Sequence, residues 1–250
     1  MAVSKTLLLA GIPIAYRFRY KETAFFYEDY FSDLPALTGT CIGPDEEALL
    51  EQLYQDEERN FRAEIDIMTA ILSDALLPYK RVVFHSAAFL WNKKAWLFAA
   101  PSGTGKTTQY YLWKKLYPRE IYILNGDKPL LSFAVSSEIR VWPSPWKGKE
   151  GLGTHLNAPL GGIIILKQDS HNRIRRATAG EAVDMVISQY ISLMKTETEI
   201  QMLLSFTERI MTDVPIYMLE NRGDRDSAEL AHDYIMGLQK VSHRDFGGVT

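Results

Sequence analysis

One nine-residue stretch constrains the fold of this 250-residue chain more than any other. It runs from Ala100 to Thr108 as APSGTGKTT and fits the phosphate-binding (Walker A) pattern of a small residue, four free positions and Gly-Lys-Thr. Gly103 and Gly105 let the backbone turn so that successive N–H groups can point at one anion. The N-terminus of a helix also favours negative charge, so a helix is expected directly after the loop. The same pattern predicts a strand before the loop.

The residues on either side of the loop have the patterns of this strand and this helix. Residues 95–99, AWLFA, are predicted to form a buried strand, and residues 107–116 a helix. We expect Lys106 to reach the outer phosphates of a nucleotide and the Thr107 hydroxyl to ligate Mg²⁺. The predicted phosphate-binding residues are Ser102, Gly103, Thr104, Gly105, Lys106, Thr107 and Thr108.

Composition argues against several classes of partner. A net charge of −3 gives no sign of general nucleic-acid binding or of attraction to an anionic membrane. No stretch approaches the roughly 18 apolar residues of a membrane span. The single cysteine, Cys41, excludes an intrachain disulfide framework and a cysteine-rich metal site, so a reducing, cytoplasmic location is expected. We interpret the short apolar start as a strand rather than a secretory signal.

The order of the predicted elements indicates an α/β protein with a mixed sheet. Residues 6–20 alternate as one or two strands, residues 61–77 form an amphipathic helix, and residues 81–91 form one strand. Further strands are predicted at 121–124, 130–135, 139–142, 162–166 and 215–219, with a hairpin turn at 136–138, two helices within 178–211 and a last helix at 225–239. The short connections favour antiparallel pairs, and the evenly alternating pattern of a doubly wound sheet is missing.

Three segments follow from this order. Residues 1–80 are expected to be an N-terminal α/β extension packed on the core. Residues 81–240 are expected to form a nucleotide-binding core, and residues 241–250 a flexible tail.

Two side chains outside the loop are candidates for chemistry. Asp127 follows an apolar run, where a second carboxylate could hold Mg²⁺ or activate a nucleophile; the alternative is an ordinary turn aspartate in Asn-Gly-Asp. His85 precedes the loop strand, and a hairpin would bring it toward the loop. There it could donate a hydrogen bond to phosphate or stabilise transferred phosphoryl oxygens, or it could be a satisfied histidine in a sheet.

A later loop adds two cations. Lys147 and Lys149 lie in SPWKGKE and could close over a substrate or the β/γ phosphates, or could be solvated loop charges. Trp142 and Trp146 are interpreted as packing anchors rather than as platforms for stacking a base.

Five short motifs in a fixed order resemble the HPr serine kinase/phosphorylase-like proteins, which belong with the PEP-carboxykinase-like P-loop proteins. The motifs are FHSAA around His85, PSGTGKTT, NGDK around Asp127, SPWKGKE and APLGGIIIL. The resemblance covers residues 80–168 and extends weakly to about residue 240 through TAGEAV and VPIYML.

The resemblance implies a mixed-sheet, ATP-dependent kinase core with flanking helices. It further implies that Lys106 and the loop amides bind phosphates and that Thr107 binds Mg²⁺. Asp127 would work at the metal or as base for an acceptor hydroxyl, and His85 matches the family's histidine upstream of the loop. Related kinases often assemble, so a homo-oligomer is one of the states it leaves open.

Departures from the family pattern qualify the implied activity. Gly126-Asp127 stands where the family commonly has two adjacent aspartates, which puts a phosphorylase reaction and full catalysis in question. The sequence EIR continues as VWPSPW instead of the family's glycine-rich signature, and the first 80 residues differ from the usual N-terminal domain. The chain is more similar to small HPr-kinase-related proteins, some of which are associated with peptide natural-product tailoring. The far longer PEP carboxykinases fit less well.

Three hypotheses follow. The first is a kinase that uses ATP and Mg²⁺ to phosphorylate a hydroxyl of a peptide, a protein or a small molecule. The second is a catalytically weak nucleotide-binding regulatory or scaffold protein, motivated by the missing second aspartate. The third, an ATPase coupled to motion, has no arginine-finger or sensor motif to support it.

Overall fold

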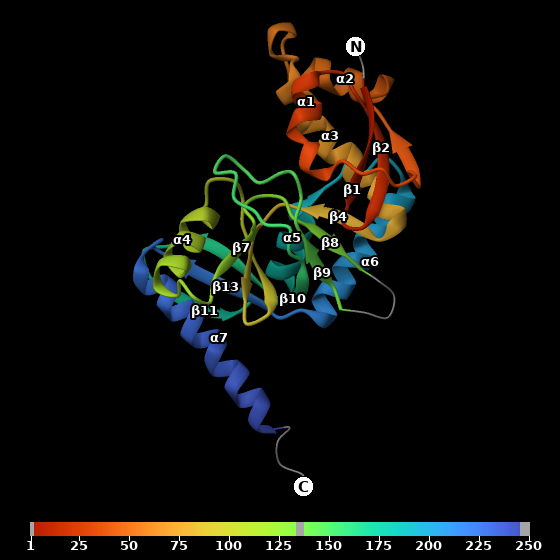
Figure 1. Cartoon of the computed structure of the whole chain (residues 1–250). Coiled ribbons are helices and arrows are strands. Elements are labelled where there is room, and N and C mark those ends of the chain that lie inside the picture. Colours follow the sequence, from red (N-terminus) through yellow and green to blue (C-terminus); the bar gives the residue numbers. More distant parts are fainter. Residues whose placement is uncertain (1–2, 134–137, 246–250) are drawn as a thin grey trace.

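A mixed α/β architecture is seen in the computed structural model (Figure 1). The structure describes residues 3–133 and 138–245, with side chains throughout except those of Glu57 and residues 238–245. A small N-terminal part, residues 3–80, sits above a larger core part, residues 81–245, and α7 projects from the core on the opposite side (Figure 1).

The N-terminal part is a small sheet beside a long helix. Its strands are β1 (Val3–Leu9), β2 (Ile12–Phe18) and β3 (Thr38–Thr40), where β1–β2 is an antiparallel hairpin and β3 runs parallel to β2. Its helices are α1 (Lys21–Phe26), α2 (Pro44–Leu53) and α3 (Phe61–Leu76), with short 3₁₀ turns at Glu28–Tyr30, Asp56–Glu58 and Leu77–Tyr79. The Asn60 side chain caps α3 by accepting from the Arg62 N–H, which satisfies one of its free N-terminal donors.

Within the described residues, ten strands of the core part form one mixed sheet in the order β12-β4-β8-β9-β10-β6-β5-β7, with β13 beside β10 and β11 beside β13. The first six are β4 (Arg81–Phe84), β5 (Ala87–Trp91), β6 (Lys94–Ala99), β7 (Tyr122–Asn125), β8 (Leu130–Ser132) and β9 (Arg140–Trp142). The others are β10 (Ala158–Gln168), β11 (Arg173–Arg176), β12 (Tyr190–Ile191) and β13 (Ile216–Asn221). The strand β10 runs parallel to β6 and β13, while the remaining pairs are antiparallel, so the predicted mixed sheet is confirmed.

Helices cover both faces of this sheet. They are α4 (Lys106–Leu116), α5 (Ala179–Gln189), α6 (Glu197–Asp213) and α7 (Arg225–Asp245). Side chains alternate between the faces along β6: Leu97 and Ala99 pack with residues of α5 and α6, whereas Trp96 and Phe98 pack with residues of α4 and α7. This period of two is the physical reason that AWLFA forms a strand buried on both sides.

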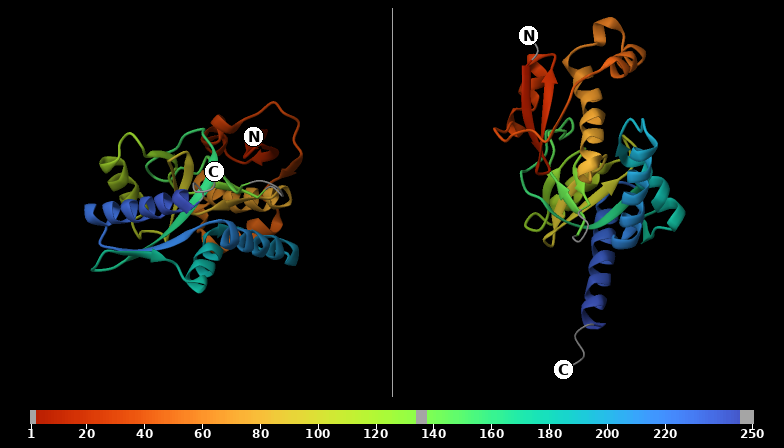
Figure 2. Two further views of the ribbon diagram at one scale, coloured as in Figure 1. Left: turned by 90° about the horizontal axis from the view of Figure 1, so that it is seen from below. Right: turned by 90° about the vertical axis from the view of Figure 1, so that its right-hand side faces the viewer.

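A third cluster joins the two parts. The helix α3 passes from the N-terminal sheet down to the core (Figure 2), and Leu7, Tyr16 and Leu72 share a buried cluster with Val83 and Leu130 of the core. The N-terminal part is therefore packed on the core through apolar side chains that neither part covers alone.

The structure differs from the sequence prediction at several places. The strands β11 and β12 were not predicted, and β10 is longer than the strand expected at 162–166. The single strand expected at 81–91 is two strands, because the chain breaks at His85-Ser86: β4 pairs with β8 and β12, while β5 pairs with β6 and β7. The last helix continues through Asp245, five residues into the segment expected to be a tail. Residues 246–250, residues 134–135 of the expected strand and residues 136–137 of the expected hairpin turn lie outside the described residues.

Candidate functional site

The glycine-rich loop joins β6 to α4, as its pattern predicts. Gly103 and Gly105 have φ values of +78° and +107°, a region that residues with a Cβ rarely adopt. A Cβ built at Gly103 would meet nothing within 4 Å, so the glycine is needed for its backbone angle, and the space above it is open. Gly105 is the residue just before α4, so the first free N–H groups of that helix lie in this loop.

Lys106, the first residue of α4, is turned back onto the loop. Its ammonium donates to the backbone oxygen of Ala100 at 2.9 Å and to that of Pro101 at 3.4 Å, and the residue is 8% exposed. Burial lowers the pKa of Lys106, the charge of Asp127 opposes that effect, and the charge of Lys128 adds to it. The amine and the Asp127 carboxylate therefore share one electrostatic environment, although they come from different elements.

Asp127 lies in the turn after β7, separated from that strand by Gly126, and faces the break between β4 and β5. Its carboxylate is 3.4 Å from His85 Nε2 and accepts a hydrogen bond from the Lys128 ammonium, and its backbone oxygen accepts from the Ser86 N–H at 2.8 Å. Burial would raise the pKa of Asp127, but His85 and Lys128 outweigh it and lower that pKa from 3.8 to about 2. The fold thus places His85 within 3.4 Å of Asp127. Such proximity is needed if both residues belong to one site.

A buried asparagine shapes the turn that holds Asp127. Asn125, at the end of β7, accepts from the N–H groups of Asp127 at 3.1 Å and Lys128 at 2.9 Å through its side-chain oxygen. Its side-chain amide donates to the backbone oxygen of Ser144 at 3.1 Å and to the Ser144 hydroxyl at 3.0 Å. All four bonds fix the carboxylate-bearing turn against the loop that begins at Pro143.

Gly126 is enclosed by backbone. A Cβ built there would lie 2.7 Å from the Lys147 backbone oxygen and 3.2 Å from that of Leu152. Real Cβ atoms do not approach oxygens so closely, so a second carboxylate at position 126 requires the 147–152 loop to move. The packing of the 147–152 loop therefore favours glycine at position 126, where the HPr-kinase-like pattern that the sequence resembles commonly has an aspartate.

A glutamine links the histidine to the glycine-rich loop. Gln189, the last residue of α5, is buried, and its backbone oxygen accepts from the His85 N–H at 2.8 Å. In the side-chain orientation that satisfies both ends of its amide, its nitrogen donates to the backbone oxygens of His85 at 2.6 Å and Ala100 at 3.2 Å. Ala100 thus accepts bonds from both Lys106 and Gln189.

The two lysines of the later loop are placed differently from each other. Lys147 is half-buried and its ammonium lies 3.8 Å from the Asp29 carboxylate of the N-terminal part, while Lys149 is exposed. Trp146 is buried and donates through its indole N–H to the Tyr27 hydroxyl at 2.8 Å, so it serves as a packing anchor. Lys147 is thereby held at the junction of the two parts, and a role for either lysine toward phosphate stays a prediction.

The donor set is chemically suited to a magnesium ion that arrives with a nucleotide. Mg²⁺ is usually bound through one or two protein oxygens together with water and substrate phosphates. Thr107 is half-buried in the first turn of α4, and Asp127 is ionised at neutral pH because its pKa is about 2. Among the described residues, no three His, Cys, Asp or Glu side chains are grouped to hold a metal by themselves.

Three residues of the site were not singled out from the sequence. Lys128 neutralises Asp127, Asn125 builds the turn, and Gln189 joins α5 to the loop. Among these three, only Lys128 could have been found from the sequence, because it directly follows the carboxylate.

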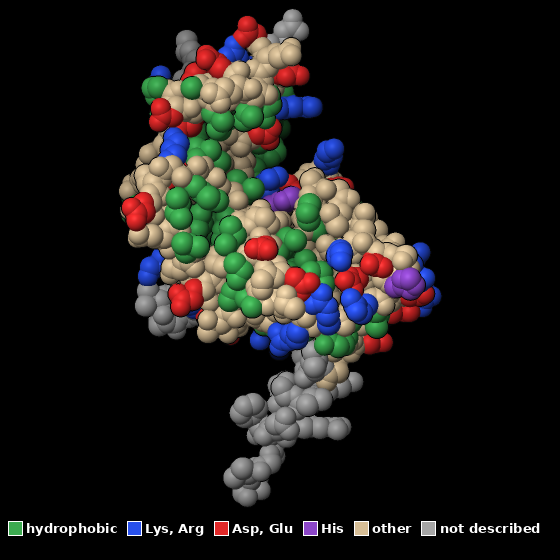
Figure 3. Space-filling model, turned by 180° about the vertical axis from the view of Figure 1, so that it is seen from behind, with side chains coloured by type: hydrophobic (Ala, Val, Ile, Leu, Met, Phe, Trp, Pro, Cys, Tyr) green, Lys and Arg blue, Asp and Glu red, His purple; other side chains and the backbone are tan. Residues whose placement is uncertain are grey.

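From behind, the molecule narrows between its two parts, and basic, acidic and histidine side chains gather at the base of this notch (Figure 3).

No described helix is both long and apolar enough to cross a lipid bilayer. Cys41, the single cysteine, is exposed and unpaired.

Comparisons with known proteins add little to this geometry. A scan against protein-family models finds no match, and neither does a search of curated proteins. Among solved structures, the HPr(Ser) kinase/phosphatase from Coxiella burnetii is similar over 67% of this chain and 99% of that chain, with 10% sequence identity and a TM-score of 0.38. A likeness that distant carries no argument about chemistry, so the case for function rests on the residues described above.

Proposed function

We propose that this protein is an ATP- and Mg²⁺-dependent kinase of the P-loop type that transfers the γ-phosphoryl group to a hydroxyl acceptor. The observation that carries the proposal is the joint environment of Lys106, Asp127 and His85. A lysine at the start of a helix, on a loop with two positive-φ glycines, shares its electrostatic surroundings with an ionised carboxylate from the turn after β7. A phosphate-binding loop paired with a carboxylate is the arrangement that phosphoryl transfer requires.

Each side chain has a role in this proposal. The loop N–H groups and Lys106 hold the phosphates and offset their negative charge, which requires the ammonium to leave the Ala100 and Pro101 carbonyls. Thr107 and Asp127 would hold Mg²⁺, which supplies further charge neutralisation when bound. A carboxylate with a pKa of about 2 is a weak base, so Asp127 is better suited to orient the acceptor hydroxyl than to remove its proton early.

Incubation with γ-labelled ATP and Mg²⁺ in cell lysate, followed by mass identification of the labelled species, tests the proposal. We expect Lys106→Ala to weaken ATP binding at least tenfold or so, because it removes the charge on the outer phosphates. Asp127→Asn should keep ATP binding largely intact and stop transfer. Normal transfer by the Asp127→Asn protein would refute the assigned role.

A second function is favoured by a specific observation. The Asp127 carboxylate already has His85 and Lys128 as partners, and position 126 has no room for a second carboxylate. Both features suit a protein that binds nucleotide without turning it over and acts as a regulatory or scaffold protein. Measurable ATP binding with no labelled acceptor, over a broad set of acceptors, would favour this function.

A further inference from the structure

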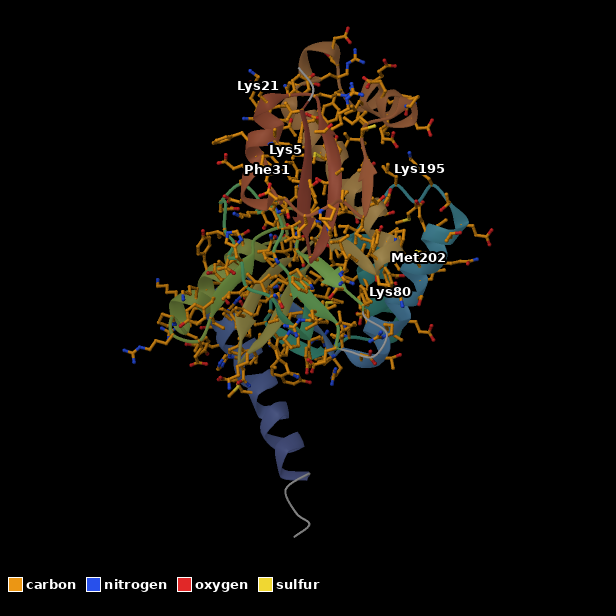
Figure 4. The ribbon with its side chains drawn as sticks, turned by 45° about the vertical axis from the view of Figure 1, so that its right-hand side comes forward. Lys5, Lys21, Phe31, Lys80, Lys195 and Met202 are labelled. Carbon is orange, nitrogen blue, oxygen red and sulfur yellow. The ribbon has the colours of Figure 1, made fainter. Side chains whose placement is uncertain are left out.

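An open hollow of about 600 Å³ lies on the N-terminal part, away from the glycine-rich loop. Three aromatic and three acidic side chains line it, namely Phe25, Phe26, Phe61, Glu22, Glu28 and Asp29, together with Lys21. Phe25 and Phe26 are 71% and 42% exposed, which is unusual for adjacent phenylalanines in a short helix. Lys21, the first residue of α1, lies at the outer edge of the N-terminal part (Figure 4).

We propose that this hollow, which we name the α1 hollow, docks a cationic polypeptide segment that carries a bulky apolar side chain. The charges favour this occupant, because the lining holds three carboxylates and one lysine. Asp29 already lies 3.8 Å from the Lys147 ammonium, so Glu22 and Glu28 are the carboxylates that would meet the incoming cation. Exposed aromatic rings accept apolar side chains and also the faces of guanidinium groups; the Arg62 guanidinium already lies 5.8 Å from the centre of the Phe61 ring. Aromatic anchors of this kind are where binding energy concentrates in interfaces.

The same charges argue against two other occupants. A second copy of this chain docking hollow to hollow would place like charges opposite each other, since a two-fold contact repeats the same patch on both sides. An anionic lipid surface would likewise be repelled by the carboxylates.

The hollow lies close to residues that contact the candidate site. Asp29 on its rim lies 3.8 Å from the Lys147 ammonium, and the adjacent Tyr27 is hydrogen-bonded to Trp146. The residue after Lys147, Gly148, packs against Asp127: a Cβ built at Gly148 would lie 3.1 Å from that of Asp127. Contacts through Asp29, Lys147 and Gly148 thus connect the hollow to Asp127. On the proposed kinase function, a segment anchored in the α1 hollow would deliver a nearby hydroxyl to the site.

Docking is tested without phosphoryl transfer. The probe is a fluorescein-labelled synthetic peptide in which Lys and Arg flank a central Phe-Leu pair and a Ser follows, measured by fluorescence anisotropy in the absence of ATP. A peptide with Glu in place of each Lys and Arg is its control. We expect the cationic peptide to bind at least about tenfold more tightly, and the difference to shrink as salt is raised.

Two surface variants locate the binding. Phe25→Ala should weaken the cationic peptide about tenfold, and Glu28→Lys severalfold, while both keep wild-type binding of a fluorescent ATP analogue. The matched controls are Leu204→Ala and Glu208→Lys on α6, an exposed leucine and an exposed glutamate far from α1 in the sequence. Absence of peptide binding, equal affinity for the two peptides, or equal losses in the α6 controls would each overturn the proposal.

The two proposals fail in distinguishable ways. Peptide binding that depends on Phe25 and Glu28, without any transfer from ATP, supports the α1 hollow and removes the kinase function. Phosphorylation of an acceptor with kinetics unaffected by Phe25→Ala and Glu28→Lys supports the kinase and removes the docking site. If both hold, the variants should raise KM for the peptide and leave kcat nearly unchanged.

Discussion

Asp127 is the residue on which the proposed chemistry depends most. Its carboxylate has a long contact to His85 and a close one to Lys128, and only about a quarter of its side chain, 24%, is exposed. Two cationic or hydrogen-bonding neighbours stabilise the charged form more than burial penalises it, which is why the pKa falls. The side chain therefore acts as a fixed negative charge in the neutral range.

The depressed pKa of Asp127 predicts how its stabilising effect depends on pH. Because the folded pKa of about 2 lies below 3.8, the folded protein binds fewer protons there, and the contribution is present above pH 3.8 and lost as pH falls toward 2. In urea unfolding, the gap between wild type and Asp127→Asn should narrow by about 1.5 kcal/mol from about pH 6 to about pH 2.5. A gap of constant size would contradict the assigned ion pairing.

Gly126 gives a second prediction at the residue scale. Gly126→Asp should lower the free energy of unfolding by about 2–4 kcal/mol, because its Cβ would lie 2.7 Å from the Lys147 backbone oxygen. Gly126→Ala separates this steric cost from the added charge. Gly180→Ala on α5 is the control, where a Cβ meets nothing within 4 Å, and its effect should stay within about 1 kcal/mol. A Gly126→Asp protein as stable as wild type would show that the 147–152 loop moves at little cost.

At the scale of elements, the site is built where three connections meet. They are the turn after β7, the break between β4 and β5, and the glycine-rich loop between β6 and α4. Backbone hydrogen bonds from His85 to Gln189 and from Ser86 to Asp127 hold the break on two sides. Loops positioned by a rigid sheet in this way are the usual place for catalytic side chains.

The turn after β7 predicts a kinetic effect at a residue that touches no substrate. Asn125→Ala leaves the Asp127 N–H without its acceptor, while the Lys128 N–H keeps the Trp146 backbone oxygen at 3.1 Å, so we expect a loss of about 1–3 kcal/mol in stability. With the carboxylate mispositioned, kcat should fall by an order of magnitude or so while KM for ATP changes little.

A matched control for Asn125 exists at the far end of the sheet. Asn172 also bridges a turn, accepting from the Arg222 N–H at 2.9 Å and donating to Asp224 at 2.9 Å. Asn172→Ala should lower stability and leave kcat unchanged. Equal kinetic losses in the two variants would mean that Asn125 acts through global stability alone.

At the scale of the whole molecule, the N-terminal part and the core share a hydrophobic cluster. Trp146 of the core lies in it beside Tyr16 and Tyr27 of the N-terminal part, and α3 crosses between the two parts (Figure 2). Because this apolar surface is covered only when both parts are folded together, we expect the chain to unfold in one cooperative transition.

The bond between Tyr27 and Trp146 allows a test of that coupling. Tyr27→Phe removes the hydroxyl that accepts from the buried Trp146 indole N–H, so the free energy of unfolding should fall by about 1–2 kcal/mol. Tyr16→Phe is the control: among the described residues no partner is found for its buried hydroxyl, so its removal should be neutral or stabilising. Intrinsic fluorescence and far-ultraviolet circular dichroism should report one shared midpoint, and two separate midpoints would contradict the coupling.

Local patterns determined much of this protein. The glycine-rich loop, the strand before it and the helix after it were predictable, because backbone freedom at Gly103 and Gly105 and alternation in AWLFA act over a few residues. The amphipathic helix at 61–77 was predictable for the same reason, and the structure places α3 at Phe61–Leu76. The antiparallel pairs of the mixed sheet followed from connections too short for parallel crossovers.

Only the tertiary structure decided what surrounds the loop. The break at His85-Ser86 arises because β4 and β5 pair with different neighbours, which no run of apolar residues in 81–91 reveals. The closed space at Gly126, the contact of His85 with Asp127 and the link through Gln189 all join residues from separate elements. Sequence alone predicted a glycine-rich loop of the phosphate-binding pattern between a strand and a helix. Folding determined which carboxylate and which histidine meet near it, since contacts between distant segments exist only once the sheet is assembled.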